Sequence, residues 1–402
     1  MPLPQFQWHP DAHAYAGAEK VMPQTGTVPR HIPAKPIVSA LSSLGRVFSS
    51  GTPFCISDYE HPCLEALEAL DAAQFATLTG GTSGTPKIIA RSQVSWLRSF
   101  DANAAQFQYS ANDSIAVLGA LSHSLALYGV LEALHLGLNA HVLSALYPAG
   151  QVAQMRLHGC TILYATPSQL RLLRPDAPLG DLRLILCGGG TLNAATREHI
   201  ASFCPNAALH VFYGAAETSF VTLSDATTPA TSVGKPYPDV QIQVRDLDET
   251  GIGTIWINSP YLFDGYLQGD SKHTSRDGAW LTVGEQGMMD EQGNLFLLGR
   301  AGRSVNIADQ TIHLDQLEAE MNAVPYIPQC VLLARPDQMR GHHVIAVVDG
   351  AASTTIRDKI LDHCKAENLH IPRDVVFLDP LPQLPSGKPD MRRIADLTGA
   401  TP

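Results

Sequence analysis

Residues 78–87 read LTGGTSGTPK, and the strand-like run that enters this segment marks the start of an α/β core. Three glycines alternate with hydroxyl side chains, so backbone amides and hydroxyls can surround a polyanion. The closing lysine, Lys87, follows a proline, whereas a Walker-type loop requires Gly-Lys-Ser/Thr. The segment therefore predicts a phosphate-binding loop unlike that of P-loop kinases and GTPases. A solvated Gly/Thr turn is the alternative for this segment alone.

Alternating strands and helices continue beyond this loop. The run SQVSWLRSFDANAAQF predicts a helix capped by Ser92, and short apolar runs such as TILYATP and LRLILCGGG predict strands of a sheet covered on both faces. Between residues 231 and 298, strands alternate with Gly/Pro/Asp turns, which indicates a β-rich subdomain. After Gly302 the pattern is roughly βαββαβ. The predicted fold class is α/β, with a layered core, a β-rich subdomain and a small α+β C-terminal domain.

The front of the chain carries weaker signals. Residues 1–36 contain several prolines and no periodic pattern, so we expect an extended or weakly ordered lead-in. Residues 37–75 hold one strand-and-helix pair, with a helix expected near 61–73.

Composition restricts the class of function. The 402 residues are 45% apolar and 16% charged, as expected for a soluble globular protein of two or more domains. A net charge of −11 without a basic cluster argues against a nucleic-acid or anionic-membrane partner. Seven scattered cysteines without a C-x-x-C pair suit reduced thiols, and neither a signal peptide nor a membrane-spanning run is visible. We therefore expect a cytoplasmic protein.

Four motifs occur in an order that resembles the adenylate-forming superfamily. They are the loop at 78–87, YGAAET at 213–218, Gly299-Arg300, and SGK at 386–388. This superfamily comprises acyl- and aryl-CoA synthetases, the adenylation domains of peptide synthetases, and luciferases. The resemblance covers residues 76–393 and implies that ATP and Mg²⁺ activate a carboxylic acid as an acyl adenylate.

The resemblance implies positions for the ATP phosphates and the metal. Glu217 matches the family's magnesium ligand, a hard oxygen donor; a surface glutamate in a turn is the alternative. The family has a threonine immediately before this glutamate, where the chain has Ala216, and neighbouring Thr218 is the candidate substitute. The implied phosphate contacts are Thr79, Thr82, Ser83, Gly84, Thr85, Lys87 and Thr218.

The adenine and ribose positions follow from two further motifs. Tyr213 is similar to the family's adenine-stacking aromatic residue. In WLTVGEQG, Glu285 takes the place of the family's ribose-binding aspartate, and Arg300 would be the second ribose contact. The complete implied set is Gly189, Gly190, Tyr213, Gly214, Glu285 and Arg300.

CGGG at 187–190 resembles the family's glycine-rich wall of the acyl pocket, with a plain strand-to-helix turn as the alternative. Gly188 and Gly189 would line this pocket, together with His123, which stands at the place of the gating aromatic residue. Amino-acid-activating relatives place an aspartate near here, but residues 122–125 are Ser-His-Ser-Leu. A plain aryl or fatty acid is therefore expected rather than an amino acid.

The last motif places Lys388 as the catalytic lysine, and Lys388 and His123 are the two catalytic residues that the resemblance implies. A lysine on a glycine-containing loop can bring its charge to the carboxylate and the α-phosphate; a solvated lysine is the alternative. Residues 1–300 would bind ATP and the acid, with 1–75 shortened relative to the family. Residues 301–402 would form a mobile domain hinged at Gly302, where the junction departs from the family pattern.

The sequence thus predicts an AMP-forming acid–thiol ligase. The acceptor would be coenzyme A or the phosphopantetheine arm of an acyl carrier protein, and the short front and altered junction favour a carrier-protein-loading enzyme of a pigment, siderophore or polyketide pathway. One alternative enzyme stops at the adenylate or transfers the acyl group to an amine. The alternative of another class is a non-catalytic protein that binds acyl adenylate or nucleotide; the joint presence of Lys87, Glu217 and Lys388 argues against it.

Overall fold

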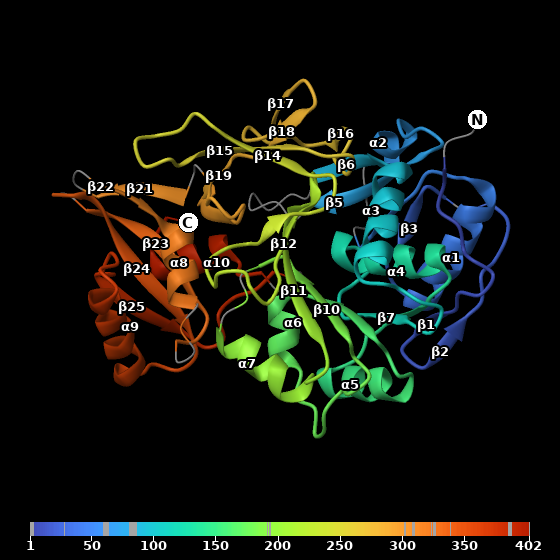
Figure 1. Ribbon diagram of the computed structural model, residues 1–402, viewed down its shortest axis with the longest axis horizontal. Helices are drawn as coiled ribbons and strands as arrows, with labels where there is room; N and C mark the ends of the chain where they lie inside the picture. The colour runs from blue at the N-terminus through green and yellow to red at the C-terminus, as the bar shows by residue number, and fades with distance from the viewer. Residues whose placement is uncertain are drawn as a thin grey trace.

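A computed structural model describes the chain apart from residues 1–3, 28, 59–63, 80–86, 191, 193, 301–302, 308–309, 323, 325–326, 338, 385–387 and 402. Over the described residues, three larger sheets precede residue 301, and a small sheet and a two-stranded hairpin follow it (Figure 1). The expected α/β class, with a β-rich subdomain and an α+β C-terminal part, is confirmed.

The largest sheet has nine strands in the described chain, in the order β13-β12-β11-β10-β9-β7-β8-β1-β2. The run from β11 to β1 is parallel, whereas the strands at both ends pair antiparallel. Every residue of β7, β9 and β10 is buried, as expected for strands covered on both faces. The bounds are β1 Ala14–Ala16, β2 Glu19–Val21, β7 Ser114–Val117, β8 Asn139–Val142, β9 Ile162–Ala165, β10 Leu184–Gly188, β11 Ala208–Ala215, β12 Ser219–Leu223 and β13 Lys235–Pro236.

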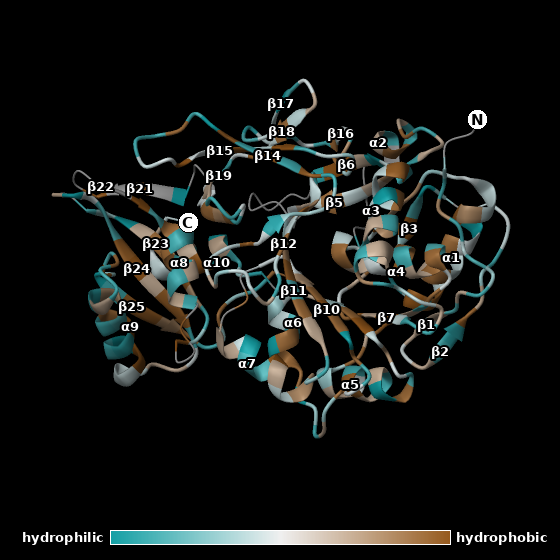
Figure 2. Cartoon of the chain, in the orientation of Figure 1, coloured by the Kyte–Doolittle hydropathy of each residue, from teal (hydrophilic) through white to brown (hydrophobic). Residues whose placement is uncertain are grey.

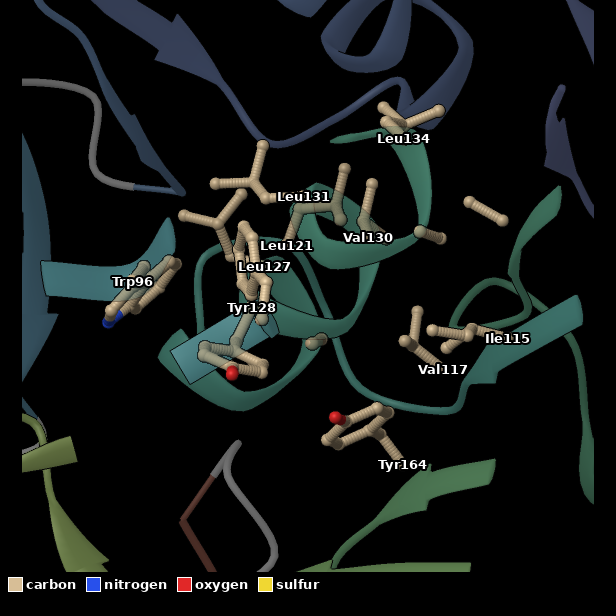
Figure 3. Packing of buried hydrophobic residues seen from close by; sticks show 14 of the residues in the cluster. Trp96, Ile115, Val117, Leu121, Leu127, Tyr128, Val130, Leu131, Leu134 and Tyr164 are labelled. Atoms are coloured by element: carbon tan, nitrogen blue, oxygen red, sulfur yellow. The ribbon is translucent and has the colours of Figure 1, made fainter. Parts of the chain in front are cut away.

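Helices cover this sheet, and the most deeply buried of them is α4 (Ser124–Leu136), in which every residue from 126 to 134 is buried. Its aliphatic side chains and Tyr128 pack with Trp96, Val117 and Tyr164 (Figure 3). A Cβ on Gly129 would lie 3.0 Å from side-chain atoms of both Val117 and Tyr164, so glycine lets the helix approach the strands closely. The other helices before residue 204 are α1 Ile37–Ser50, α2 Leu64–Glu68, α3 Gln93–Gln106, α5 Pro148–Leu157, α6 Pro167–Leu172 and α7 Ala194–Phe203.

Two smaller sheets complete the part before residue 301. In the described chain, one contains the strands β16-β6-β5-β4-β3 and the other the strands β17-β18-β15-β19-β20, with β14 paired to β15. The second sheet is antiparallel throughout, as expected for the turn-rich segment at 231–298. The bounds are β3 His31–Pro33, β4 Cys55–Ser57, β5 Gln74–Thr79, β6 Lys87–Ser92, β14 Gln241–Arg245, β15 Gly253–Asn258, β16 Gly265–Gln268, β17 Ser275–Asp277, β18 Trp280–Thr282, β19 Glu285–Met289 and β20 Leu295–Arg300.

The front of the chain differs from the expected lead-in. Strands β1 and β2 form a hairpin whose first strand pairs with β8, in the register Ala14↔Ala140, and β3 pairs with β4. The prediction was wrong because strands of three residues carry too little periodicity to be visible and are fixed by partners far away in the sequence. Residues 37–75 contain two helices instead of the one expected, because α1 (Ile37–Ser50) was missed. The helix expected near 61–73 is α2, limited to Leu64–Glu68 among the described residues, and Ser92 occupies the N-cap of α3 without a side-chain capping bond.

The part after residue 302 has its own sheet, β23-β24-β25, and its own buried clusters. Hydrophilic colours dominate α9, whose buried residues are Ile360 and Cys364 (Figure 2). The predicted helices and strands are confirmed in kind and order. The bounds are β21 Ser304–Ile307, β22 Gln310–His313, α8 Leu314–Asn322, β23 Cys330–Asp337, β24 Gly341–Asp349, α9 Thr354–Ala366, β25 Asp374–Leu378 and α10 Met391–Thr398.

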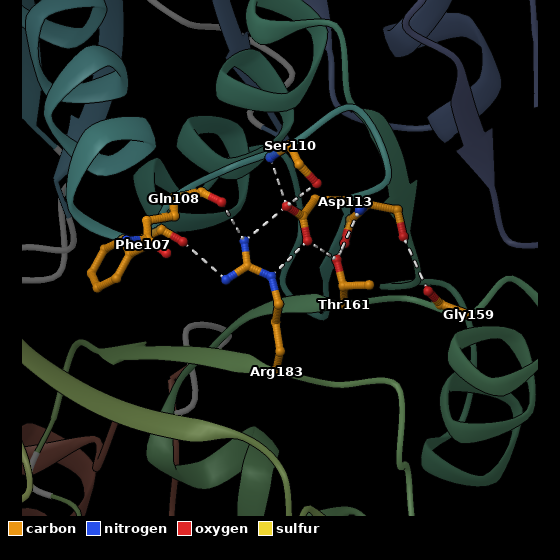
Figure 4. A network of polar contacts seen from close by, with 8 residues as sticks. Phe107, Gln108, Ser110, Asp113, Gly159, Thr161 and Arg183 are labelled. Carbon is orange, nitrogen blue, oxygen red and sulfur yellow. Dashed lines mark hydrogen bonds and ion pairs between the residues drawn. The ribbon is translucent and has the colours of Figure 1, made fainter.

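An ion pair fixes the chain where it enters β7. Asp113 accepts from Arg183 Nε at 2.7 Å, from the Ser110 N–H at 2.8 Å and from Thr161 Oγ1 at 2.8 Å (Figure 4). Burial alone would raise the pKa of Asp113, but these hydrogen bonds outweigh burial and lower the pKa to about 2. The carboxylate therefore joins the loop before β7 to the segments that precede β9 and β10.

None of the helices in the described part of the chain has the length and apolar character needed to cross a membrane.

Candidate functional site

The predicted phosphate loop joins β5 to β6, a strand that the sequence pattern did not reveal. The two strands are antiparallel, and Thr79 and Lys87 are cross-strand partners, so the ends of the loop lie beside each other. The other implied loop contacts, Thr82, Ser83, Gly84 and Thr85, lie outside the described residues, and their roles stay predictions.

Lys87 lies against a segment that sequence reasoning overlooked. Its Nζ is 5.4 Å from the ring centroid of Tyr266, within the range of a cation–π contact. Gly269, with a φ of +73°, passes so close that a Cβ there would lie 3.0 Å from Lys87 Cγ. The stem and the charged end of Lys87 are thus both in contact with the segment around β16.

The same segment contacts the predicted metal ligand. Tyr266 donates from its hydroxyl to Glu217 Oε1 at 2.9 Å, and the Phe263 N–H donates to the Glu217 carbonyl at 2.9 Å. The structure therefore brings Lys87 and Glu217, which are far apart in the sequence, to one tyrosine, the lysine at its ring and the carboxylate at its hydroxyl.

A buried arginine fixes the turn around Glu217. Arg91 is 0% exposed and donates to the Ala216 carbonyl at 2.5 Å, to Ser219 Oγ at 2.6 Å and to the Tyr261 carbonyl. Burial lowers the pKa of Arg91 to about 10, while the carboxylates of Asp264 and Glu217 oppose that shift. Arg91 was missed, although an arginine directly after the apolar run IIA was a visible signal.

Thr218 occupies the inside of this turn. Its buried Oγ1 accepts from the Ala215 N–H at 2.9 Å and donates to the Ser219 carbonyl at 3.3 Å. A phosphate contact by Thr218 would therefore require the turn to open, and that role stays a prediction. Gly214 is required by packing, because a Cβ there would lie 2.0 Å from the Ser219 carbonyl oxygen.

Three predicted residues and Thr166, which was not predicted, lie at the carboxyl ends of strands of the nine-stranded sheet. His123 follows β7, Thr166 follows β9, Gly189 follows β10, and Tyr213 lies near the end of β11. Because these four strands are parallel, their carboxyl ends meet at one edge, the usual position of ligand sites in such sheets. Tyr213 is half-buried and pairs with Thr222, and a β-bulge follows it.

The glycine-rich turn after β10 contacts the second half of the chain. Gly189 has a φ of +87°, and a Cβ there would lie 3.7 Å from Lys388 Cε and 3.7 Å from Thr166 Cγ2. A Cβ on Gly188 would lie 2.1 Å from the Phe212 ring, so that ring covers the turn from the β11 side. A Cβ on Gly190 would lie 3.7 Å from Pro167 Cγ.

Glu285 and Arg300, the two implied ribose contacts, are cross-strand partners at one end of the β19–β20 pair. Ribose binding by these two residues stays a prediction. The predicted hinge Gly302 lies outside the described residues. Just after it, Arg303 pairs with Asp315 at 2.6 Å and with Glu318, which fixes the chain to α8.

The donor set around Glu217 fits magnesium. In the described part of the chain, no group of three or more His, Cys, Asp or Glu side chains is arranged to hold a metal ion. Mg²⁺ is commonly bound through one or two carboxylates together with phosphate oxygens and water. The single carboxylate of Glu217, held in place by Tyr266, fits such an ion.

Comparisons with known sequences find similarity to acyl-CoA ligases. The uncharacterized acyl-CoA ligase YhfT of Bacillus subtilis is 30% identical over 83% of this chain and 71% of its own length. The 2-succinylbenzoate-CoA ligase of Lactococcus lactis is 28% identical over 69% of this chain and 60% of its own length.

Solved structures show the same fold. The amide bond synthetase McbA of Marinactinospora thermotolerans is 25% identical, with a TM-score of 0.68 over 80% of this chain and 69% of that protein. The anthranilate CoA ligase AuaEII, solved with anthranoyl-AMP, has a TM-score of 0.72 over 92% of this chain and 78% of that protein; at 17% identity it supports the fold alone. The family model described as AMP-binding enzyme matches residues 19–267, more than half of the chain, and the resemblance to the adenylate-forming superfamily is confirmed. The chain therefore belongs to the AMP-binding enzyme family.

Proposed function

We propose that this chain is an AMP-forming acid–thiol ligase that activates a carboxylic acid with ATP and passes the acyl group to coenzyme A. The observation that carries the proposal is the contact between Lys388 and the glycine turn at Gly189, because it brings a cation to the carboxyl edge of the parallel sheet. The acyl-CoA ligase relatives support the same reaction class.

In the first step a carboxylate oxygen attacks the α-phosphorus of ATP, the bond from that phosphorus to the bridging oxygen breaks, and pyrophosphate leaves with the electron pair. Lys388 offsets the repulsion between the two anions as they approach. Lys87 and the loop between Thr79 and Lys87 hold the β- and γ-phosphates. A magnesium ion held by Glu217 supplies neutralising charge there when it is bound.

In the second step a thiolate attacks the acyl carbon and AMP leaves. We place the hinge at Gly302, with residues 301–402 rotating between the two steps. The ion pair from Arg303 to Asp315 supports this boundary, since it attaches the chain just after the hinge to α8. The phosphopantetheine arm of an acyl carrier protein is the alternative acceptor.

The substrate that we propose is an aryl or fatty acid without an amino group. The Phe212 ring against Gly188 gives the glycine turn an apolar neighbour. The run from Ser122 to Leu125, which follows β7, itself carries no carboxylate that could pair with a substrate ammonium. We also propose a cytoplasmic location, supported by the cysteines of the described chain, which are buried and unbridged.

A second candidate function is amide formation, in which an amine replaces the thiol. The likeness to the amide bond synthetase McbA, at 25% identity and a TM-score of 0.68, favours it.

The deciding experiment measures pyrophosphate release with panels of aryl, fatty and amino acids, followed by product analysis with CoA, a holo carrier protein or amines. Acid-dependent pyrophosphate release with a CoA thioester as product supports the main proposal. Amide as the favoured product supports the second candidate. Absence of pyrophosphate release with every acid excludes both, and highest release with amino acids refutes the substrate class.

A further inference from the structure

We propose that Tyr266 is a positioning residue that holds the metal-binding carboxylate of Glu217 and the phosphate-binding ammonium of Lys87 as one unit. The inference rests on the proposed function and adds a residue to its machinery. It predicts that the affinity for the metal and the affinity for the nucleotide phosphates depend on different parts of one side chain.

The hydroxyl of Tyr266 is engaged on both sides. It lies 2.9 Å from Glu217 Oε1 and 2.9 Å from Thr274 Oγ1. An ionised carboxylate can only accept, so Tyr266 donates its proton to Glu217 and accepts one from Thr274. A charge-assisted hydrogen bond to one carboxylate oxygen fixes the orientation of the whole group.

The ring of Tyr266 serves the lysine. Lys87 Nζ lies 5.4 Å from the ring centroid, and the ring itself packs edge-to-face on Phe263 with centroids 5.1 Å apart. The strand pairing β6–β16 places Tyr266 opposite Ile89, two residues beyond Lys87 on the same strand. The ring is thus fixed relative to the end of the phosphate loop.

The same segment also fixes the backbone of Glu217. The Phe263 N–H donates to the Glu217 carbonyl at 2.9 Å, so this residue is held at its main chain by Phe263 and at its side chain by Tyr266. Binding sites whose groups are oriented in advance lose less entropy when the ligand arrives. Tyr266 therefore prepares the carboxylate and the lysine for a magnesium-nucleotide complex.

Two substitutions separate the hydroxyl from the ring. Tyr266→Phe removes the donor to Glu217 and keeps the face beneath Lys87. Tyr266→Leu removes the hydroxyl donor and also the aromatic face beneath Lys87. Tyr261→Phe is the matched control, because the hydroxyl of Tyr261 is buried and has no hydrogen-bond partner among the described residues. Thr274→Val removes the donor behind Tyr266 and is expected to give a smaller change in the direction of Tyr266→Phe.

The experiment titrates ATP into the purified full chain by isothermal calorimetry, without metal and over a series of Mg²⁺ or Mn²⁺ concentrations, with thermal unfolding as a check on folding. For Tyr266→Phe we expect unchanged metal-free ATP affinity and an increase of about tenfold in the metal concentration for half-maximal enhancement of binding. For Tyr266→Leu we expect the same increase together with metal-free affinity weaker by about threefold. Tyr261→Phe should match the wild type in both measurements.

A metal requirement of Tyr266→Phe equal to that of the wild type overturns the inference, while acid-dependent pyrophosphate release by the wild type keeps the proposed function. Equal losses in Tyr266→Phe and Tyr261→Phe overturn it as well, because they indicate a general packing effect. A wild type that binds no ATP with or without metal overturns both the inference and the function on which it rests. The Tyr266→Phe variant decides the matter even if Tyr266→Leu does not fold.

Discussion

The side chain of Lys388 lies against Gly189, with Cε 3.7 Å from the place that a Cβ of the glycine would occupy. Gly189 follows β10 of the large sheet and Lys388 precedes α10, so the two parts of the chain meet at this point. If Lys388 acts only while the carboxylate and the α-phosphate react, its loss should separate the two half-reactions.

Lys388→Ala should lower acid-dependent pyrophosphate release by about 100-fold or more, because no other charge replaces the ammonium at the reacting phosphate. The variant should still convert a supplied acyl adenylate to the thioester. Both rates are measured by rapid quench, with Lys365→Ala, an exposed lysine in the same part of the chain, as control. Equal loss of both half-reactions would contradict the assignment.

Glu217→Ala should lower pyrophosphate release by about 100-fold at low magnesium, and added magnesium should restore part of it. The reason is that the turn loses the carboxylate offered to the metal, while Arg91 still fixes its backbone. The measurement is the magnesium dependence of the rate, with the exposed Glu249→Ala as control. A variant as active as the wild type at low magnesium would remove Glu217 from the site.

Asp113→Asn should lower the free energy of unfolding by about 3 kcal/mol at neutral pH, because Arg183 then loses its carboxylate partner. The pKa of Asp113 is lowered to about 2, below its value in the unfolded chain. Its contribution is therefore present above pH 4 and is lost as the pH falls through about 2.

Urea unfolding at pH 7 and at pH 3 checks this expectation, and the difference between Asp113→Asn and wild type should shrink at the lower pH. Asp176→Asn is the matched control, since Asp176 forms an exposed ion pair with Arg156 and should show no measurable loss. Similar losses in both variants would show that burial of Asp113 does not matter.

His141 should make stability depend on pH between 5 and 6.5. Burial, and then the neighbouring His158, lower the pKa of His141 to about 3, and its ring stacks on Tyr15 at a centroid distance of 4.7 Å. The unfolded chain binds the proton near pH 6.5 whereas the folded chain does not, so stability is complete above that pH. Below pH 6.5 the free energy of unfolding falls by up to about 1.4 kcal/mol per pH unit. His141→Phe should flatten this slope in urea unfolding; an unchanged slope would exclude His141 as its source.

Glu132 should have the opposite effect. It is fully buried, accepts from Asn103 Nδ2 at 2.7 Å and from the Tyr164 hydroxyl at 2.6 Å, and burial raises its pKa to about 8. Because the folded pKa lies above the unfolded one, stability is complete below about pH 4.5 and is lost as the pH rises through 8. Between pH 5 and 8.5, Glu132→Gln should lose less stability than the wild type in thermal unfolding. A loss of stability larger than that of the wild type would contradict a neutral Glu132.

Most of the long, apolar elements of the fold could be predicted, although the helix α1 was missed. Strands such as β10 and helices such as α4 carry enough buried residues to be recognised from composition alone. The three-residue strand β1 could not be recognised, since it exists through pairing with β8 in the register Ala14↔Ala140. Strand β6 was hidden for a related reason, because a glycine-rich loop does not reveal that its two ends are paired.

A candidate site residue could be predicted where it belongs to a known motif. It could not be predicted where only a tertiary contact indicates its role. Glu217, Gly189 and Lys388 were predicted from motifs; the structure brings Gly189 and Lys388 together, and the roles of all three stay predictions. Tyr266 and Arg91 were missed because a tyrosine after a glycine and an arginine in a strand are common. Their importance arises from the tertiary structure, which places both beside the Glu217 turn.

The nine-stranded sheet ends on each side in a short outer strand, β2 on one side and β13 on the other. At one edge, β2 is three residues long and exposes Glu19 and Lys20; at the other, β13 is two residues long and exposes Lys235 and Pro236. Charges at an edge resist pairing with a foreign strand, and a proline offers no N–H to it. The nine-stranded sheet is therefore protected on both sides against pairing with a strand of another molecule.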